Sequence, residues 1–135
     1  MRNYRGKRLN TGEWITGFLV DAKHIGNWVE ADPVQCETVG ECTGIMGDFI
    51  HGEPKPGDNI LRSFIYEGDI VEPVMTDGTH KGFSWGKRVV VFYQGAFCLK
   101  DRRGIITPMC NYSANVKFMV RGNIHDNPEL LEVTE

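Results

Sequence analysis

Residues 65–71 read IYEGDIV and residues 122–131 read GNIHDNPELL. In each stretch, branched or aromatic residues meet a short polar turn, which is the pattern of a β-strand that enters or leaves a tight corner. In the first stretch Gly68 can adopt a positive φ angle, and the Asp69 carboxylate can accept backbone N–H groups across the turn. We therefore predict that Glu67, Gly68 and Asp69 form a structural corner of a β-sheet.

The second stretch contains the clearest helix start in the chain. Asn127 can cap a helix, Pro128 suits the first helical position, and an acidic residue follows at the positive end of the helix dipole. Asn123 lies in the polar turn before the cap. We interpret Asn123, Asn127 and Pro128 as structural turn residues that lead into one or two helical turns.

The remaining sequence is divided into short segments by sixteen glycines. Aromatic and branched residues between the glycines predict about seven short strands and almost no helix. Residues 87–93 form the clearest strand; its apolar run suggests a central position covered on both faces, and Gln94-Gly95 turns it into residues 96–99. Further strands are expected at residues 14–20, 27–30, 38–44, 64–66, 70–71, 105–107 and 116–122.

These features predict a mainly β fold: a small antiparallel β-barrel or sandwich, closed or partly open, with short helical turns. The 135 residues suit a single domain over residues 1–135. Residues 46–63 differ from the rest, because proline and glycine alternate there with acidic residues. We expect a long loop over this range.

The composition is that of a globular protein, with 41% hydrophobic and 24% charged residues. A net charge of -3 gives no overall attraction to nucleic acid or to an anionic membrane. No apolar run approaches the length of a membrane-spanning segment, and the basic first eight residues lack the apolar region of a secretion signal. We expect a cytoplasmic protein without membrane contact.

Cofactor, metal and catalytic signals are weak. The spacing of the four cysteines, Cys36, Cys42, Cys98 and Cys110, suits neither a zinc site nor a disulfide framework. Glu67 and Asp69 share a strand face and could act as an acid–base pair or as metal ligands, but no histidine or third carboxylate stands at a suitable spacing. We predict no metal, no cofactor and no enzymatic activity.

A basic patch is possible where two hairpins adjoin, because tight turns bring their basic residues together. Small β-barrels bind single-stranded nucleic acid through such patches when aromatic side chains lie nearby. Basic residues on edge strands also serve to prevent aggregation, so the pattern has a purely structural interpretation as well. The candidate residues are Lys87, Arg88, Lys100, Arg102 and Arg103.

The two stretches quoted first, together with shorter blocks elsewhere, resemble the YopX-like family of phage and prophage proteins. Residues 65–71 and 122–131 carry the strongest resemblance, and weaker blocks are found at residues 5–8, 12–14, 17–20, 37–40 and 43–44. The connection over residues 45–64 is longer than the family usually has. The resemblance implies a mainly β protein of phage or prophage origin, with no assigned activity and no established catalytic residues.

The sequence favours a non-enzymatic binding module. A protein partner is the leading hypothesis, with a second copy of the chain as one candidate, because short edge strands allow strand addition. Trp28, Phe83 and Trp85 lie near glycines and could anchor such an interface, although aromatic residues of this size also cap the ends of a core. Single-stranded nucleic acid at the basic patch is the alternative.

Overall fold

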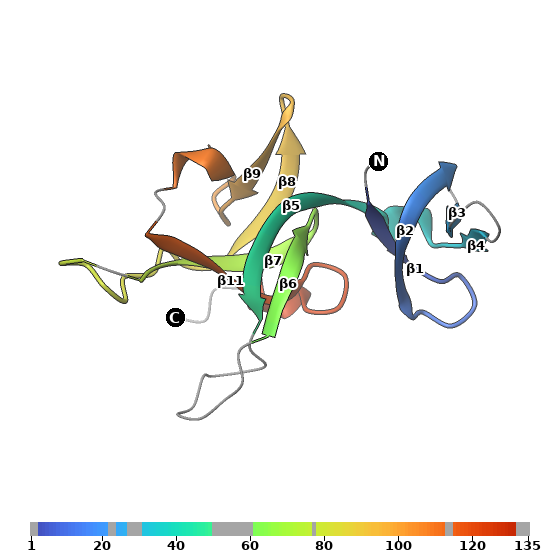
Figure 1. Ribbon diagram of the computed structural model, residues 1–135, viewed down its shortest axis with the longest axis horizontal. Coiled ribbons are helices and arrows are strands. Elements are labelled where there is room, and N and C mark those ends of the chain that lie inside the picture. The colour runs from blue at the N-terminus through green and yellow to red at the C-terminus, as the bar shows by residue number, and fades with distance from the viewer. Residues whose placement is uncertain are drawn as a thin grey trace. The chain divides into compact units, whose positions relative to one another are not determined.

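A computed structural model describes residues 3–21, 24–26, 31–49, 61–76, 78–112 and 115–131 of the chain. The contacts divide the chain into two compact units, Met1–Thr43 and Gly44–Glu135. The single domain expected over residues 1–135 stays a prediction. One strand, β5 (Gly40–Phe49), contributes its first residues to the first unit and the remainder to the second (Figure 1).

The first unit is an antiparallel sheet in the order β5-β1-β2-β3-β4. Its other strands are β1 (Tyr4–Lys7), β2 (Trp14–Asp21), β3 (His24–Gly26) and β4 (Ala31–Pro33). A bridge between Arg8 and Val34 brings the end of β4 back toward β1. Ile25 and Val34 are buried at its centre, and the short 3-10 helix η1 (Cys36–Thr38) follows. The hydroxyl of Thr38 accepts the backbone N–H of Lys7 at 2.9 Å, which ties η1 to β1.

The second unit has the order β10-β9-β8-β7-β11-β5, with β6 on the far side of β5. The pairs from β10 to β11 are antiparallel, whereas β11 and β5 run parallel. Its strands are β6 (Leu61–Tyr66), β7 (Asp69–Met75), β8 (Arg88–Tyr93), β9 (Ala96–Lys100), β10 (Ile106–Pro108) and β11 (Val116–Asn123). Two 3-10 helices complete it, η2 (Met109–Asn111) and η3 (Pro128–Leu131).

One face of this second sheet carries its hydrophobic core. The buried side chains come from five strands and from η2: Ile65, Val71, Val90, Leu99, Met109 and Val120. Partly buried Ile45, Phe97, Tyr112 and Phe118 pack around them. Branched residues at alternate positions of paired strands share one face, so the period of two in the sequence produces this cluster directly.

The β8–β9 hairpin turns at Gln94 and Gly95, which both have positive φ, 49° and 82°. This combination is the one that two-residue hairpins prefer, and it fixes the register in which Phe92 pairs with Phe97. β8 lies between β7 and β9, as predicted. The prediction that both of its faces are covered was wrong for its second half, since Phe92 and Tyr93 are about half exposed at the hairpin tip.

The mainly β prediction is confirmed. In the described residues neither sheet closes into a barrel, so the open alternative is the one observed. The long loop predicted over residues 46–63 is shorter at both ends, because β5 extends to Phe49 and β6 begins at Leu61. The centre of that range, residues 50–60, lies outside the described residues, and so does the strand expected at residues 27–30.

All four cysteines are free thiols; Cys98 is buried, Cys42 is partly buried, and Cys36 and Cys110 are exposed. No helix in the described part of the chain has the length and apolar character needed to cross a membrane.

Candidate functional site

The two polar turns that dominate the sequence lie side by side in the second unit. Asp69 pairs with Asn123 across the β7–β11 ladder, and the Gly68 carbonyl accepts the Ile124 N–H at 2.9 Å. The Asp69 carboxylate is only 2% exposed and accepts the Tyr66 N–H at 2.8 Å. The Asp69 carboxylate is therefore closed to solvent and bonded within the turn, whereas Glu67 remains partly exposed.

The second turn is bonded mostly to itself. The Asn123 side-chain oxygen accepts the N–H groups of His125 and Asp126 at 3.0 and 2.9 Å, and the Asn127 side chain accepts the Asn123 N–H at 3.3 Å. Pro128 then begins η3. These bonds give Asn123 and Asn127 a place in the architecture of the corner, and they direct η3 toward the turn between β9 and β10.

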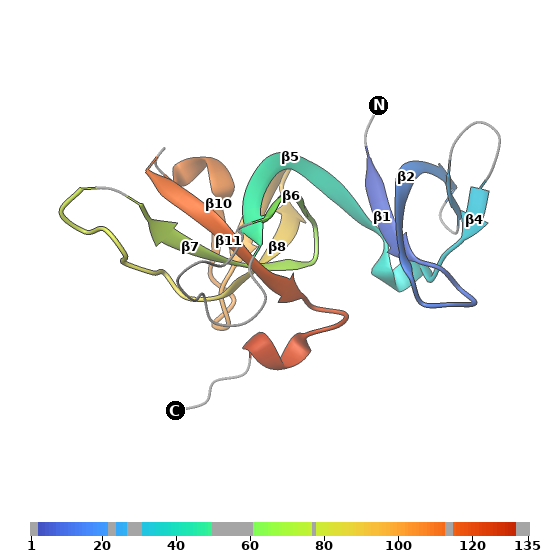
Figure 2. The same ribbon diagram turned by 60° about the horizontal axis from the view of Figure 1, so that its bottom comes forward.

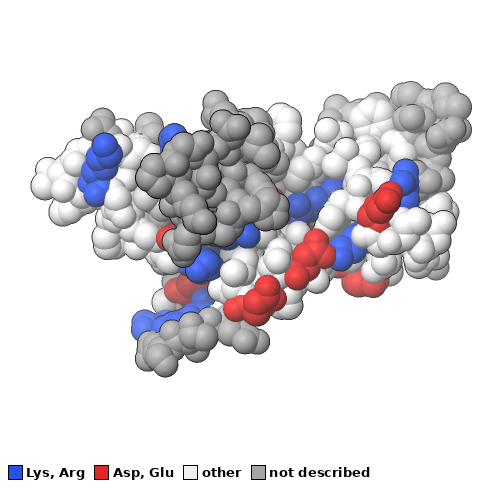
Figure 3. Space-filling model, turned by 90° about the horizontal axis from the view of Figure 1, so that it is seen from below, with Lys and Arg blue, Asp and Glu red and all other residues white. Residues whose placement is uncertain are grey.

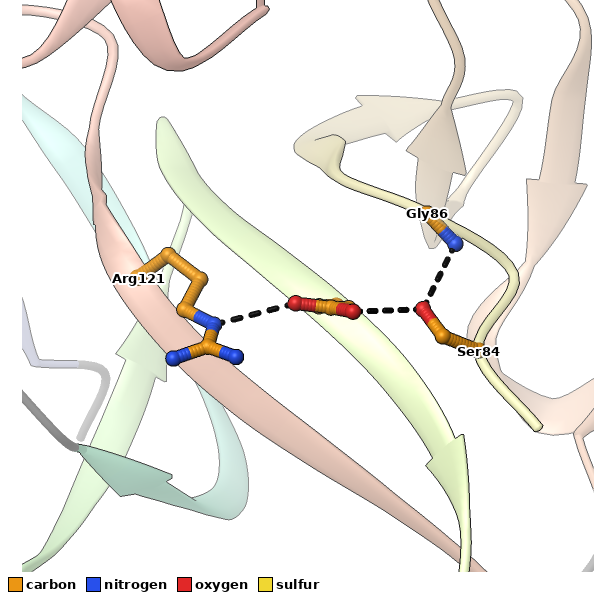
Figure 4. Close-up of polar contacts among 4 residues, drawn as sticks. Ser84, Gly86 and Arg121 are labelled. Carbon is orange, nitrogen blue, oxygen red and sulfur yellow. Dashed lines mark hydrogen bonds and ion pairs between the residues drawn. The ribbon is translucent and has the colours of Figure 1, made fainter. Parts of the chain in front are cut away.

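A polar network on the sheet face opposite the core fixes the segment that precedes β8. The Arg121 guanidinium donates to Glu72 at 3.0 Å, the Ser84 hydroxyl donates to the other Glu72 oxygen at 2.5 Å, and the Gly86 N–H donates to Ser84 at 3.0 Å (Figure 4). Arg121 is the extra residue of a bulge in β11. Burial alone would raise the pKa of Glu72, but the Ser84 and Arg121 hydrogen bonds, with the Arg121 and Lys87 charges, lower it.

This anchored segment leads directly into a basic pocket, defined here by the residues that line it. It has a volume of about 450 Å³ and lies between the start of β8, the β9–β10 turn and η3. The lining residues are Trp85, Gly86, Lys87, Arg88, Asp101, Arg102, Arg103, Leu130 and Leu131. Four basic side chains from two turns therefore surround one hollow, and Asp101 is the carboxylate among them.

A second hollow, the aromatic pocket, adjoins the first and measures about 560 Å³. It is lined by Met75, Trp85, Arg88, Asp101, Ile105, Thr107, Asn111, Tyr112 and Val116. Trp85, Arg88 and Asp101 belong to both pockets and form their common wall. The two hollows therefore lie next to each other and are taken together as the candidate site, which is apolar and aromatic on one side and basic on the other.

The aromatic wall is a chain of near-perpendicular ring contacts. Ring centroids are 5.0 Å apart between Phe83 and Trp85, 5.6 Å between Trp85 and Tyr112, and 5.5 Å between Tyr112 and Phe118. Phe118 packs on the core and Phe83 is 54% exposed, so the chain leads from the core to solvent. Edge-to-face contacts of this kind hold each ring in a defined orientation.

Asp101 and Arg88 form the polar centre of the common wall. The Asp101 carboxylate accepts the N–H groups of Ile105 and Arg103 at 2.9 Å each, which shapes the β9–β10 turn. The Ile105 bond is the largest influence on Asp101, and with the Arg103 N–H and the Arg88 and Arg103 charges it lowers the pKa of this carboxyl. Burial raises the pKa of the nearby Tyr112 phenol.

The structure brings together most of the residues predicted for a basic patch. Lys87, Arg88, Arg102 and Arg103 line one pocket with Trp85, and Phe83 contacts the Trp85 ring. Lys100 does not join them. It pairs with Val89, the residue next to Arg88, so the Lys100 and Arg88 side chains leave opposite faces of the sheet. Trp28 lies outside the described residues.

Sequence reasoning missed the residues that reach the site from distant segments, namely Tyr112, Asn111, Leu130 and Leu131. Asn111 and Tyr112 lie at the end of η2 and just after it, and Leu130 and Leu131 lie in η3; no local pattern signals where these segments pack. In the described residues no group of three or more His, Cys, Asp or Glu side chains is placed to hold a metal ion.

Another basic and aromatic cluster lies in the first unit. The Arg5 guanidinium is 4.8 Å and the Lys7 ammonium 5.4 Å from the centre of the Trp14 ring. Here the cations contact the ring itself. Basic and acidic side chains are interspersed on the face shown in Figure 3, in agreement with the net charge of -3.

The fold and the site can now be set beside known proteins. No curated protein and no solved structure matches the chain. A family model described as YopX protein matches residues 62–132, which is more than half of the chain and includes both polar turns and both pockets. The weaker resemblance blocks before residue 62 lie outside this match and remain predictions. The chain belongs to the YopX family.

Proposed function

We propose that this chain is a non-enzymatic binding module of phage or prophage origin that binds single-stranded nucleic acid in the host cytoplasm. The observation that carries the proposal is the convergence of four basic side chains and Trp85 on one pocket beside an aromatic one. Proteins that hold single strands combine a positively charged groove along the backbone with aromatic platforms for the bases.

The local character of the charge supports a single strand over a duplex. The overall charge of -3 provides no long-range attraction, so binding depends on a few phosphates contacted within the pocket. The aromatic pocket is a concave hollow, which an unstacked base can enter and a paired base cannot. A duplex would contact only the rim of the aromatic pocket.

A fluorescence anisotropy titration with a labelled oligonucleotide of about twelve nucleotides tests the proposal, since comparable small β domains contact roughly 4–16 nucleotides. If all four basic side chains engage phosphates, affinity falls roughly 50-fold between 50 and 200 mM salt. Replacing Arg102 and Arg103 by alanine should weaken binding and halve the slope of log affinity against log salt concentration.

The matched control replaces two exposed lysines away from the pocket, Lys81 and Lys117, by alanine. Lys117 pairs with Val74 on the sheet face opposite the core. The control removes the same charge and should leave affinity nearly unchanged. No binding at 50 mM salt, or an equal loss in both double variants, would remove the proposal.

A second candidate function is contact with another protein, including a second copy of the chain. Support comes from the β8–β9 hairpin tip, where Phe92 and Phe97 meet with ring centroids 5.1 Å apart and Phe92 and Tyr93 remain about half exposed. Such aromatic groups are enriched at interfaces. Strand addition at β10 is unfavourable because this edge strand has three residues and ends in Pro108. Light scattering at micromolar concentration distinguishes a monomer from a dimer, and Phe92→Ser should abolish any dimer.

A further inference from the structure

We propose that the aromatic pocket receives the base of one nucleotide while a phosphate of the same strand lies in the basic pocket. This inference rests on the proposed function and specifies how the strand is held. It predicts a site that reads one unstacked base, rather than a surface that attracts phosphates alone.

The shared wall is the first reason. A ligand that fills both pockets passes across Trp85, Arg88 and Asp101, with apolar contacts on one side and cations on the other. A nucleotide has this polarity, because its base is flat and largely apolar on its faces while its phosphate is anionic. The volume of about 560 Å³ lies in the range of roughly 300–1,000 Å³ found for small-ligand sites.

The rigidity of the aromatic wall is the second reason. Trp85 contacts Phe83 on one side and Tyr112 on another at interplanar angles of 84° and 89°. Its backbone carbonyl also accepts two hydrogen bonds from Arg88, at 3.3 and 3.2 Å. A ring and a cation fixed in this way before binding lose little conformational entropy when a base and a phosphate are added.

Polar groups at the edge of the aromatic pocket are the third reason. The Thr107 hydroxyl, the Asn111 amide and the Asp101 carboxylate line it among apolar side chains. Hydroxyl, amide and carboxylate groups are those that read the hydrogen-bonding edges of bases. An aliphatic lipid chain would form no hydrogen bond with Thr107 or Asn111, whereas Asp101 already accepts two backbone N–H groups of its turn.

Oligonucleotides with and without bases provide the test. A single-stranded 12-mer, about the length used above, is compared with the same backbone carrying abasic sites throughout. Loss of one well-stacked base should reduce affinity by about 5- to 140-fold, and the fully abasic strand should retain only the salt-sensitive phosphate binding. Alanine at Arg102 and Arg103 should weaken both strands.

Tryptophan emission supplies an independent readout. In a variant with Trp14→Phe and Trp28→Phe, Trp85 is the remaining tryptophan of the chain. The base-containing strand should quench its emission, whereas the abasic strand should not. A strand that binds and quenches Trp85 therefore supports base insertion even if the fold-change in affinity is small.

The outcomes separate this inference from the function on which it rests. Equal affinity of both strands, without quenching, would overturn base insertion and leave phosphate-driven binding in place. Absence of binding by either strand would overturn both. Arg102- and Arg103-dependent binding of a glutamate-rich peptide, with no binding of the oligonucleotides, would assign the site to an acidic protein segment instead.

Discussion

The guanidinium of Arg88 donates two hydrogen bonds to the backbone carbonyl of Trp85, at 3.3 and 3.2 Å. This contact joins the cationic and the aromatic parts of the candidate site through a single side chain. Because Arg88 begins β8 and Trp85 precedes this strand, the contact fixes the irregular segment to the sheet beside both pockets. Figure 2 shows the ribbon of β8 in the second unit and the short helix η3 that follows β11.

Arg88→Lys should weaken both the fold and the binding, because lysine keeps the charge but cannot form the two-pronged contact. We expect unfolding free energy to fall by about 1–2 kcal/mol, the usual net value of such hydrogen bonds. Urea denaturation measures this loss, and the anisotropy titration should show reduced affinity with an unchanged salt slope. Arg103→Lys is the control, since it keeps the charge in the exposed turn and should change neither quantity. Equal behaviour of the two variants would contradict the positioning role of Arg88.

Glu72→Gln should loosen the segment that carries Trp85, since the Arg121–Glu72–Ser84 network would lose its charge. We expect a loss of about 1–3 kcal/mol, as for a hydrogen-bonded, partly buried charge. Urea denaturation at pH 7 gives the value, with Glu129→Gln in the first turn of η3 as an exposed control that should cost no more than about 0.5 kcal/mol. A Glu72 variant as stable as the Glu129 variant would show that the network contributes nothing.

The pH dependence of stability provides a separate prediction for Glu72. Its pKa is lower in the folded protein than the ordinary value of 4.5. The contribution of ionised Glu72 to the free energy of unfolding is therefore complete above about pH 4.5. It is lost as the pH falls through the pKa that Glu72 has in the folded protein. The difference in unfolding free energy between the natural chain and Glu72→Gln should shrink on acidification from pH 5 to pH 3. A difference that grows over this range would show that folding raises the pKa of Glu72 instead of lowering it.

Gly122→Ala should be strongly destabilising, because a Cβ at this position would overlap the side-chain amide oxygen of Asn127. Overpacking against the corner, added to an unfavourable φ of 158°, suggests a loss of about 2–4 kcal/mol. Gly12→Ala is the matched control, with a φ of 75° and nothing within 4 Å of the added carbon. It should cost only about 1 kcal/mol. Similar thermal midpoints for the two variants would contradict the close packing of the corner.

Lys100→Ala should leave nucleic-acid affinity unchanged, whereas Lys87→Ala should lower it. Both lysines belong to the patch predicted from the sequence, but only Lys87 lines the basic pocket. The comparison removes one positive charge in each case, so it measures position rather than net charge. Fluorescence anisotropy at 50 mM salt measures the affinity of each variant. An equal loss of affinity in both would favour a diffuse basic surface over a pocket.

The parts of the fold that follow from local patterns could be predicted from the sequence. Branched residues before Gln94-Gly95 and after it specify the β8–β9 hairpin, because the turn permits only one register. Pro128 likewise begins η3, as the local sequence predicts, but the Asn127 side-chain oxygen accepts the N–H of Asn123 before the helix, and the Asn127 backbone carbonyl accepts the Leu130 N–H. The gathering of Arg88 with Arg102 and Arg103 follows from that hairpin and the next turn, without knowledge of the whole sheet.

Features that depend on contacts between distant segments, such as the length of β5 and the position of Tyr112, could not be predicted from the sequence. β5 continues to Phe49 through Gly44 and Gly47, which weaken a strand, because β11 pairs with it there. Lys100 was grouped with Arg88 because both belong to this hairpin, but its register pairs Lys100 with Val89 and so places the two basic side chains on opposite faces. Tyr112 enters the aromatic pocket because η2 packs on the core, a placement that no neighbouring residue encodes.

Mapping backbone amide shifts by NMR, as a single-stranded oligonucleotide is added, tests the central claim most directly. The account predicts that perturbations concentrate at residues 85–88, 101–107 and 111–112, around the common wall of the two pockets. Perturbations centred on Arg5, Lys7 and Trp14 of the first unit, or no perturbation at 50 mM salt, would contradict it.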